Sequence, residues 1–182
     1  MYRTKQIFDL QTIETERILP FFNNIIHYKS SSISVESVFT EQVVPLSRFV
    51  VKSRLIFAIS LLRSYLALGI KLYMPVLLPL GCKFRILVPP VVEVHNNHFY
   101  LVDGMHRLYV LIRERIHTVH VCVVRHVPYP LPAKPINWLQ VEEVSITKPL
   151  LNNITNLKVE LFRPVTKLLN SPLTIVKKEK TI

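Results

Sequence analysis

The central part of the chain has a pattern of apolar and polar positions that predicts a strand, a turn, a helix and a second strand. Residues 99–124 read FYLVDGMHRLYVLIRERIHTVHVCVV. Apolar residues run into a turn at Asp103-Gly104, a helical pattern follows, and a β-branched stretch closes the unit. We predict a helix over residues 104–115 with Arg107 on its outer face. Its inner face is predicted to bury Met105, Leu108, Ile112 and either Tyr109 or Leu111.

The residues before this unit predict two strands and a tight turn. Residues 84–94 alternate between apolar and polar types, and two prolines at 89–90 interrupt them, so the second strand is expected to begin at Val91. Residues 95–98, HNNH, then form the turn, because asparagine tolerates the left-handed conformation. Glu93 alternates with apolar neighbours, so we expect it to face solvent rather than to act in catalysis. The histidine spacing matches no metal motif, and no metal site is predicted.

An apolar run precedes these strands. Residues 54–80 are strongly apolar, but two basic residues and Pro75 interrupt them, so no charge-free stretch is long enough to span a membrane. A buried helix over residues 54–68, ended by Gly69, is favoured. The alternative is an interfacial helix whose basic residues face anionic lipid, and a membrane surface is accordingly the less favoured partner.

The two ends of the chain carry weaker patterns. Apolar spacing predicts a helix on each side of Pro20, and weak alternation predicts a strand over residues 35–44. Beyond Arg125 four prolines predict an extended arm, in which Trp138 either pins the arm to the core or serves as an anchor for a partner. Residues 148–182 are expected to form a basic, loosely ordered tail.

Length and charge narrow the class of protein. The 182 residues suit one domain with a sizeable core, so we assign residues 1–127 to that domain, with its core at 84–124, and residues 128–182 to the arm and extension. The formal charge of +11 favours anionic partners such as nucleotides and nucleic acid. No carboxylate lies between Glu41 and Glu93, whereas seven basic residues do: Arg48, Lys52, Arg54, Arg63, Lys71, Lys83 and Arg85.

Composition also excludes several kinds of site. Two cysteines are too few for a disulfide framework or a zinc site, and three glycines exclude a glycine-rich phosphate loop. The first residues, MYRTKQIFDL, lack the apolar core of a secretory signal, so a cytoplasmic location is expected.

The turn at the start of the predicted helix is the candidate site. Asp103 is placed to cap the helix, and Gly104, having no Cβ, allows another group to approach the first turn. His106 and Arg107 follow in that turn, where unpaired backbone N–H groups favour an anion, so the four residues together predict a phosphate or carboxylate site. The alternative is structural: Asp103 is only a cap, His106 is half-buried and Arg107 is a solvated charge.

This stretch resembles the signature of the ParB/sulfiredoxin superfamily, which includes ParB-like N-terminal and nuclease-type domains. The resemblance covers residues 88–124: a D-G-x-H-R box at 103–107, preceded by PVVEV at 90–94 and followed by the strand at 119–124. It implies an α+β fold with a small mixed sheet and packed helices, in which the box opens a helix at a nucleotide site. Known members include DNA-binding chromosome-partitioning CTPases, ATP-using sulfiredoxins, free-serine kinases and nuclease-type proteins.

Individual residues separate these branches. Sulfiredoxins place a cysteine before the His-Arg pair, where this chain has Met105, and a thioether cannot be the attacking thiolate. Partitioning proteins carry a G-E-R-R-type box, whereas residues 104–107 read GMHR and contain no carboxylate. The box is more similar to that of the serine-kinase branch and of many uncharacterised members, in which the histidine and the arginine would contact phosphates.

Two classes of function are therefore predicted. The first is a nucleotide- or phosphate-binding ParB-like domain centred on Asp103, Gly104, His106 and Arg107. The resemblance implies ATP or CTP with Mg²⁺ as its ligand and phosphoryl transfer or NTP hydrolysis as its chemistry if it is an enzyme. The second is a non-catalytic protein that binds nucleic acid through its basic surface, marked by steep salt dependence. No catalytic base stands at a diagnostic spacing, so both classes stay open.

Overall fold

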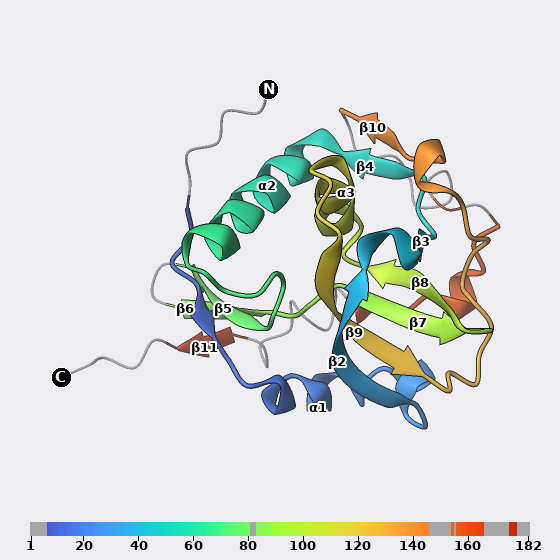
Figure 1. The fold of residues 1–182 in the computed structure, drawn as a ribbon. Helices are drawn as coiled ribbons and strands as arrows, with labels where there is room; N and C mark the ends of the chain where they lie inside the picture. Colours follow the sequence, from blue (N-terminus) through green and yellow to red (C-terminus); the bar gives the residue numbers. More distant parts are fainter. Residues whose placement is uncertain (1–6, 81–82, 146–153, 155, 166–174, 178–182) are drawn as a thin grey trace.

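The computed structural model describes residues 7–80, 83–145, 154, 156–165 and 175–177. Its architecture is α+β, with helices packed against a small mixed sheet, as the sequence predicts (Figure 1). In the described part of the chain, no helix combines the length and the apolar character needed to cross a membrane.

The main sheet has five strands in the order β2-β9-β7-β8-β3. The pairs β2–β9 and β7–β8 are antiparallel, whereas β7–β9 and β3–β8 are parallel. Asn96 and Asn97 join β7 to β8 with φ angles of 49° and 62°, so the predicted asparagine turn is confirmed. The strands are β2 (Ser32–Phe39), β3 (Val43–Pro45), β7 (Val91–His95), β8 (His98–Asp103) and β9 (Thr118–Arg125).

Two helices pack beside this sheet. Helix α2 (Lys52–Ala67) has Leu68 as its C-cap, and Gly69 follows with a left-handed φ of 63°. The predicted buried helix, ended by Gly69, is confirmed. Helix α3 (Met105–Arg113) follows β8 directly, as predicted, and packs against α2. Its buried residues are Leu108, Val110 and Leu111, whereas Met105 and Ile112 are only half-buried.

Two smaller sheets complete the fold. One has the order β1-β5-β6-β11 and lies beyond the C-terminal half of α2 in Figure 1; the other pairs β4 with β10 in parallel. Their strands are β1 (Gln11–Thr12), β4 (Phe49–Val51), β5 (Val76–Leu80), β6 (Lys83–Leu87), β10 (Glu142–Val144) and β11 (Ile175–Lys177).

The segment around Pro20 forms short turns instead of the two predicted helices. Only α1 (Leu19–Phe22) is α-helical, and the 3₁₀ turns η1 (Thr15–Arg17) and η2 (Ile26–Tyr28) flank it. Ile25 is extended, with ψ of 114°, and this interrupts the helix. The helical spacing of the apolar residues arises because Ile18, Phe22 and Ile25 are all buried in one cluster. The strand predicted over residues 35–44 is divided between β2 and β3 by the 3₁₀ turn η3 (Thr40–Gln42).

The arm beyond β9 packs on the core. Trp138 begins the 3₁₀ turn η4 (Trp138–Gln140) and donates a hydrogen bond from Nε1 to the Val43 carbonyl at 2.7 Å, which confirms that it pins the arm. A further 3₁₀ turn, η5 (Val159–Leu161), follows later in the chain. Most of the tail predicted over residues 148–182, namely 148–153, 155, 166–174 and 178–182, lies outside the described residues.

Glu93 is fully buried, so the prediction that it faces solvent is wrong. Its carboxylate accepts hydrogen bonds from Tyr28 Oη at 2.8 Å and Arg163 Nε at 2.8 Å, and His95 Nε2 lies 2.9 Å from it. Alternation along β7 does not separate core from solvent, because both faces of the sheet are covered. Val92 belongs to one apolar cluster and Val91 to the other.

Candidate functional site

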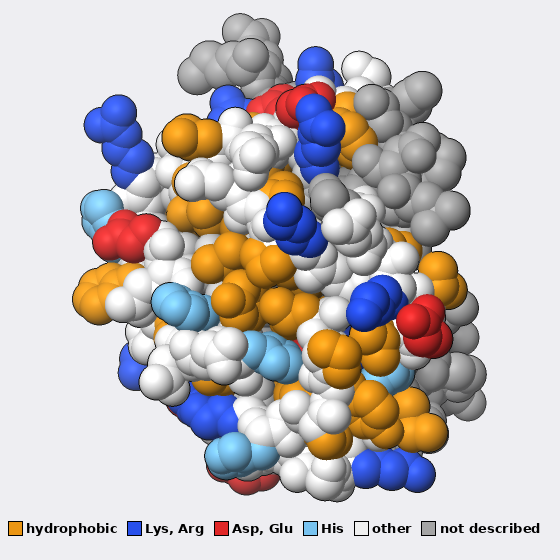
Figure 2. All heavy atoms as spheres, turned by 90° about the vertical axis from the view of Figure 1, so that its right-hand side faces the viewer, with side chains coloured by type: hydrophobic (Ala, Val, Ile, Leu, Met, Phe, Trp, Pro, Cys, Tyr) orange, Lys and Arg blue, Asp and Glu red, His pale blue; other side chains and the backbone are white. Residues whose placement is uncertain are grey.

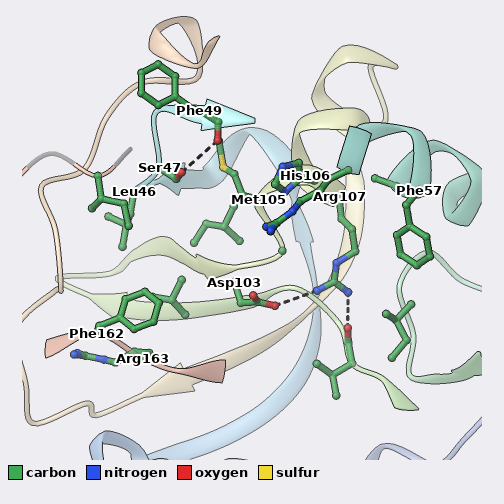
Figure 3. A pocket seen from close by; sticks show the side chains of 18 of the residues that line it. Leu46, Ser47, Phe49, Phe57, Asp103, Met105, His106, Arg107, Phe162 and Arg163 are labelled. Carbon is green, nitrogen blue, oxygen red and sulfur yellow. Dashed lines mark hydrogen bonds and ion pairs between the residues drawn. The ribbon is translucent and has the colours of Figure 1, made fainter. Parts of the chain in front are cut away.

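A cavity of about 600 Å³ lies where α2, β6, the β8–α3 turn and the C-terminal arm meet (Figure 3). All four predicted site residues, Asp103, Gly104, His106 and Arg107, line it. The structure therefore brings the predicted box to the wall of a cavity whose size is typical of ligand sites. The other residues used below that line it are Phe49, Arg54, Phe57, Arg85, Phe162 and Arg163.

Gly104 is required by the backbone of its own chain. It is the N-cap residue of α3 with φ of 94°, and a Cβ there would lie 2.6 Å from Pro90 Cβ and 2.9 Å from Pro90 Cα. A side chain at this position would therefore clash with the residue that precedes β7. The close approach predicted for Gly104 is thus made by Pro90.

The N-cap residue of α3 is Gly104 and not Asp103, so this part of the prediction is wrong. The Asp103 carboxylate faces the Arg107 guanidinium, with 3.3 Å between Oδ2 and NH2 (Figure 3). The four-residue spacing places both side chains on the same face of the turn. A charged partner within reach competes with the backbone N–H groups for the carboxylate.

Arg107 is held on three sides. Besides Asp103, its NH1 donates to the Val88 carbonyl at 2.5 Å, and its guanidinium lies 5.6 Å from the centre of the Tyr73 ring. Its side chain is only 11% exposed, so the prediction that it occupies the outer face of the helix is wrong. The spacing of apolar residues predicted an outer position for Arg107 because that spacing carries no information on polar partners from other segments of the chain.

His106 is a neutral acceptor at the start of α3. Its Nε2 accepts the Val51 backbone N–H at 2.9 Å, so the ring proton lies on Nδ1. Burial, and after it the positive charges of Arg54 and Arg107, lower the His106 pKa to about 4. At neutral pH His106 therefore brings no positive charge to the cavity. Because Val51 is the N-cap of α2, the bond fixes the start of α2 beside the start of α3.

Sequence reasoning missed three arginines in the cavity wall. Arg54 lies in the first turn of α2, is exposed, and makes no ion pair with another described residue. Arg85 comes from β6. Both belong to the basic run between Glu41 and Glu93, but nothing in the run separates cavity residues from surface residues. Arg163 lies in the tail and carries no local signal.

The wall offers little to a metal ion by itself. Among the described residues, Asp103 is the only carboxylate that lines the cavity, and no group of three or more histidine, cysteine or acidic side chains has the arrangement of a metal site. Mg²⁺ is usually held by one or two carboxylates together with substrate phosphates. Asp103 fits that pattern as the one carboxylate ligand. The remaining ligands of the ion would have to include phosphate oxygens of a bound substrate.

Comparison with known proteins identifies the family of the chain. The model of the ParB CE domain matches residues 16–145. The chain belongs to the ParB CE domain family, and the resemblance carried by the D-G-x-H-R box is confirmed. No curated protein matches the chain. A solved structure, protein Atu1540 from Agrobacterium tumefaciens, aligns at 12% identity and a TM-score of 0.39 over 63% of this chain and 64% of that one.

Proposed function

We propose that this ParB-like domain binds a nucleotide, or a related phosphate-bearing ligand, in the cavity at the start of α3. The observation that carries the proposal is that Arg54, in the first turn of α2, and Arg107, in the first turn of α3, line the same cavity of about 600 Å³. Ligand cavities commonly have volumes of about 300–1,000 Å³. Guanidinium groups beside a helix N-terminus favour phosphate oxygens.

The roles of the site residues follow from their present partners. Arg54 is exposed and makes no ion pair among the described residues, so it is the side chain best able to turn to a phosphate. Arg107 is fixed by Val88 and Asp103 and would act as a positioned charge. His106 would offer only the Nδ1 proton of a neutral ring. The first-turn backbone N–H groups of Met105 and His106 have no intrahelical carbonyl to bond.

We propose ATP or CTP with Mg²⁺ as the ligands to test first. Asp103 would contribute one oxygen to the ion, and the phosphates would contribute others. If the domain carries out phosphoryl transfer or hydrolysis, Asp103 is also the one carboxylate of the described cavity wall within reach of an acceptor. Glu93 is unsuited to that role because it is fully buried and bonded to Tyr28 and Arg163.

The second candidate is nucleic-acid binding through the basic surface. Three basic residues are exposed and do not line the cavity: Lys52, Arg63 and Lys71. Their charges outside the cavity favour this second candidate. Arg48 is also exposed but pairs with Glu142 at 2.7 Å. On the face in Figure 2 the Lys and Arg side chains lie apart from one another, and hydrophobic side chains gather near the centre. This face therefore lacks the continuous basic patch that would favour the second candidate over the first.

A thermal-shift screen tests the proposal. The purified protein is heated with ATP, ADP, CTP and GTP, each with and without Mg²⁺, and in parallel with a DNA duplex at several salt concentrations. A ligand present at 100 times its Kd raises the unfolding free energy by about 2.7 kcal/mol. Stabilisation by one nucleotide supports the proposal. Stabilisation by DNA alone, falling steeply with salt, would replace it with the second candidate.

A further inference from the structure

Residues beyond the part of the chain that matches the family model add a wall to the cavity. The ParB CE match ends at residue 145, yet Phe162 and Arg163 line the cavity together with residues of α2 and α3. The family match therefore says nothing of this side of the site. Its chemistry must be derived from the contacts of Phe162 and Arg163 themselves.

The arm is fixed to the core at Arg163. The Arg163 and Glu93 side chains are 1% and 0% exposed, and Nε lies 2.8 Å from Oε1. Arg163 NH2 also donates to the Pro130 carbonyl at 2.9 Å, and the Lys158 backbone N–H donates to the Pro132 carbonyl at 2.8 Å. Phe162, the residue next to this anchor, is thereby held at a defined place.

Phe162 also differs from the other aromatic residues of the wall. The Phe49 ring has the Arg48 guanidinium 5.5 Å from its centre, and the Phe57 ring lies 5.4 Å from the Phe8 ring. The half-buried Phe162 ring has no aromatic or cationic partner among the described residues. In Figure 3 it lies on the opposite side of Asp103 from Arg107, away from the proposed phosphate end.

We propose that Phe162 determines ligand specificity: its ring is the surface on which the base of a bound nucleotide stacks, and the Arg163–Glu93 pair holds that ring in place. This inference rests on the proposed nucleotide binding and assigns the base end of the same site. Aromatic faces stack on any base, with a strength of about 1–3 kcal/mol per base. The arm therefore separates ligands that carry a base from inorganic phosphates.

The test compares a nucleotide with its base-free counterpart on the full-length chain. Titration calorimetry measures the Kd of ATP, CTP and inorganic tripolyphosphate, each with Mg²⁺, for the wild type, Phe162→Leu and Phe162→Tyr. Leucine keeps an apolar side chain but removes the ring, and tyrosine keeps the ring. We expect Phe162→Leu to raise the nucleotide Kd about tenfold. We also expect it to change the tripolyphosphate Kd less than twofold, and Phe162→Tyr to leave both constants within twofold.

The outcomes separate this inference from the function on which it rests. If wild-type protein binds ATP or CTP no more tightly than tripolyphosphate, base stacking is overturned while the phosphate site stands, and this result needs no variant. Equal losses for nucleotide and tripolyphosphate in Phe162→Leu would also overturn it, because the ring would then act on the whole site. If the wild type binds none of the three ligands, the proposed function itself fails.

Discussion

Arg163 and Glu93 form an almost completely buried ion pair although 70 positions separate them in the chain. Glu93 lies on β7, an inner strand of the main sheet that pairs with β8 and β9. Arg163 lies in the arm just after η5. The pair joins the part of the chain that matches the ParB CE family to a segment outside it.

Replacing Glu93 by glutamine should therefore destabilise the protein strongly. The substitution leaves the Arg163 charge buried without a carboxylate, and breaking a buried pair in this way typically costs about 3–5 kcal/mol. The free energy of unfolding in urea measures the loss. Arg48→Gln is the matched control, since it breaks the exposed Arg48–Glu142 pair and should cost less than about 1 kcal/mol. Equal costs for the two substitutions would mean that the arm is not anchored through Glu93.

Two glycines with positive φ allow the clash at the β8–α3 turn to be measured. Gly69→Ala places a Cβ in open space, so it should cost only the left-handed backbone penalty of about 1 kcal/mol. Gly104→Ala adds the 2.6 Å clash with Pro90 and should cost about 2–4 kcal/mol. The free energy of unfolding in urea, measured for both variants, checks the difference. An equal loss of stability at the two positions would show that Pro90 can move away from the new Cβ at no cost.

The Asn96-Asn97 turn, α2 with its end at Gly69, and the β8–α3–β9 unit were predictable because each has a local cause. Left-handed asparagines, an apolar run ended by glycine and a helical spacing all act within about 15 residues. The partners of Asp103 were not predictable in the same way. A capping role and an ion pair with Arg107 are both compatible with the spacing, and the choice depends on Val88 and Tyr73, which come from other segments.

The cavity was predictable only in part for a related reason. Its box at 103–107 is local, but Arg54 and Arg85 reach it through the packing of α2 and β6, and Phe162 reaches it through the arm. Glu93 shows the limit of alternation as a signal, since a polar residue on a sheet covered on both faces must find a buried partner. That partner, Arg163, lies in a stretch without periodicity.

The lowered His106 pKa predicts how stability changes with pH. The folded protein has a His106 pKa of about 4, against 6.5 for a free histidine, so the unfolded chain binds more protons between these values. Stability from the neutral ring is therefore present above pH 6.5 and is lost as the pH falls toward 4, by up to about 3 kcal/mol. His106→Gln keeps an acceptor for the Val51 N–H but does not titrate. Urea unfolding between pH 4 and 7 should show a smaller slope in this variant, and an unchanged slope would refute the assignment.

The most direct test of the nucleotide site compares one arginine and one lysine in the first turn of α2. Arg54 lines the cavity, whereas Lys52, two residues earlier and also exposed, does not. Titration calorimetry measures the Kd of ATP and of CTP with Mg²⁺ for the wild type, Arg54→Gln and Lys52→Gln, which lose the same charge. A charge-assisted hydrogen bond contributes about 1.5–3 kcal/mol, so Arg54→Gln should raise the Kd at least tenfold and Lys52→Gln less than twofold. Equal effects of the two substitutions, or no nucleotide binding by the wild type, would contradict a phosphate site at the start of α3.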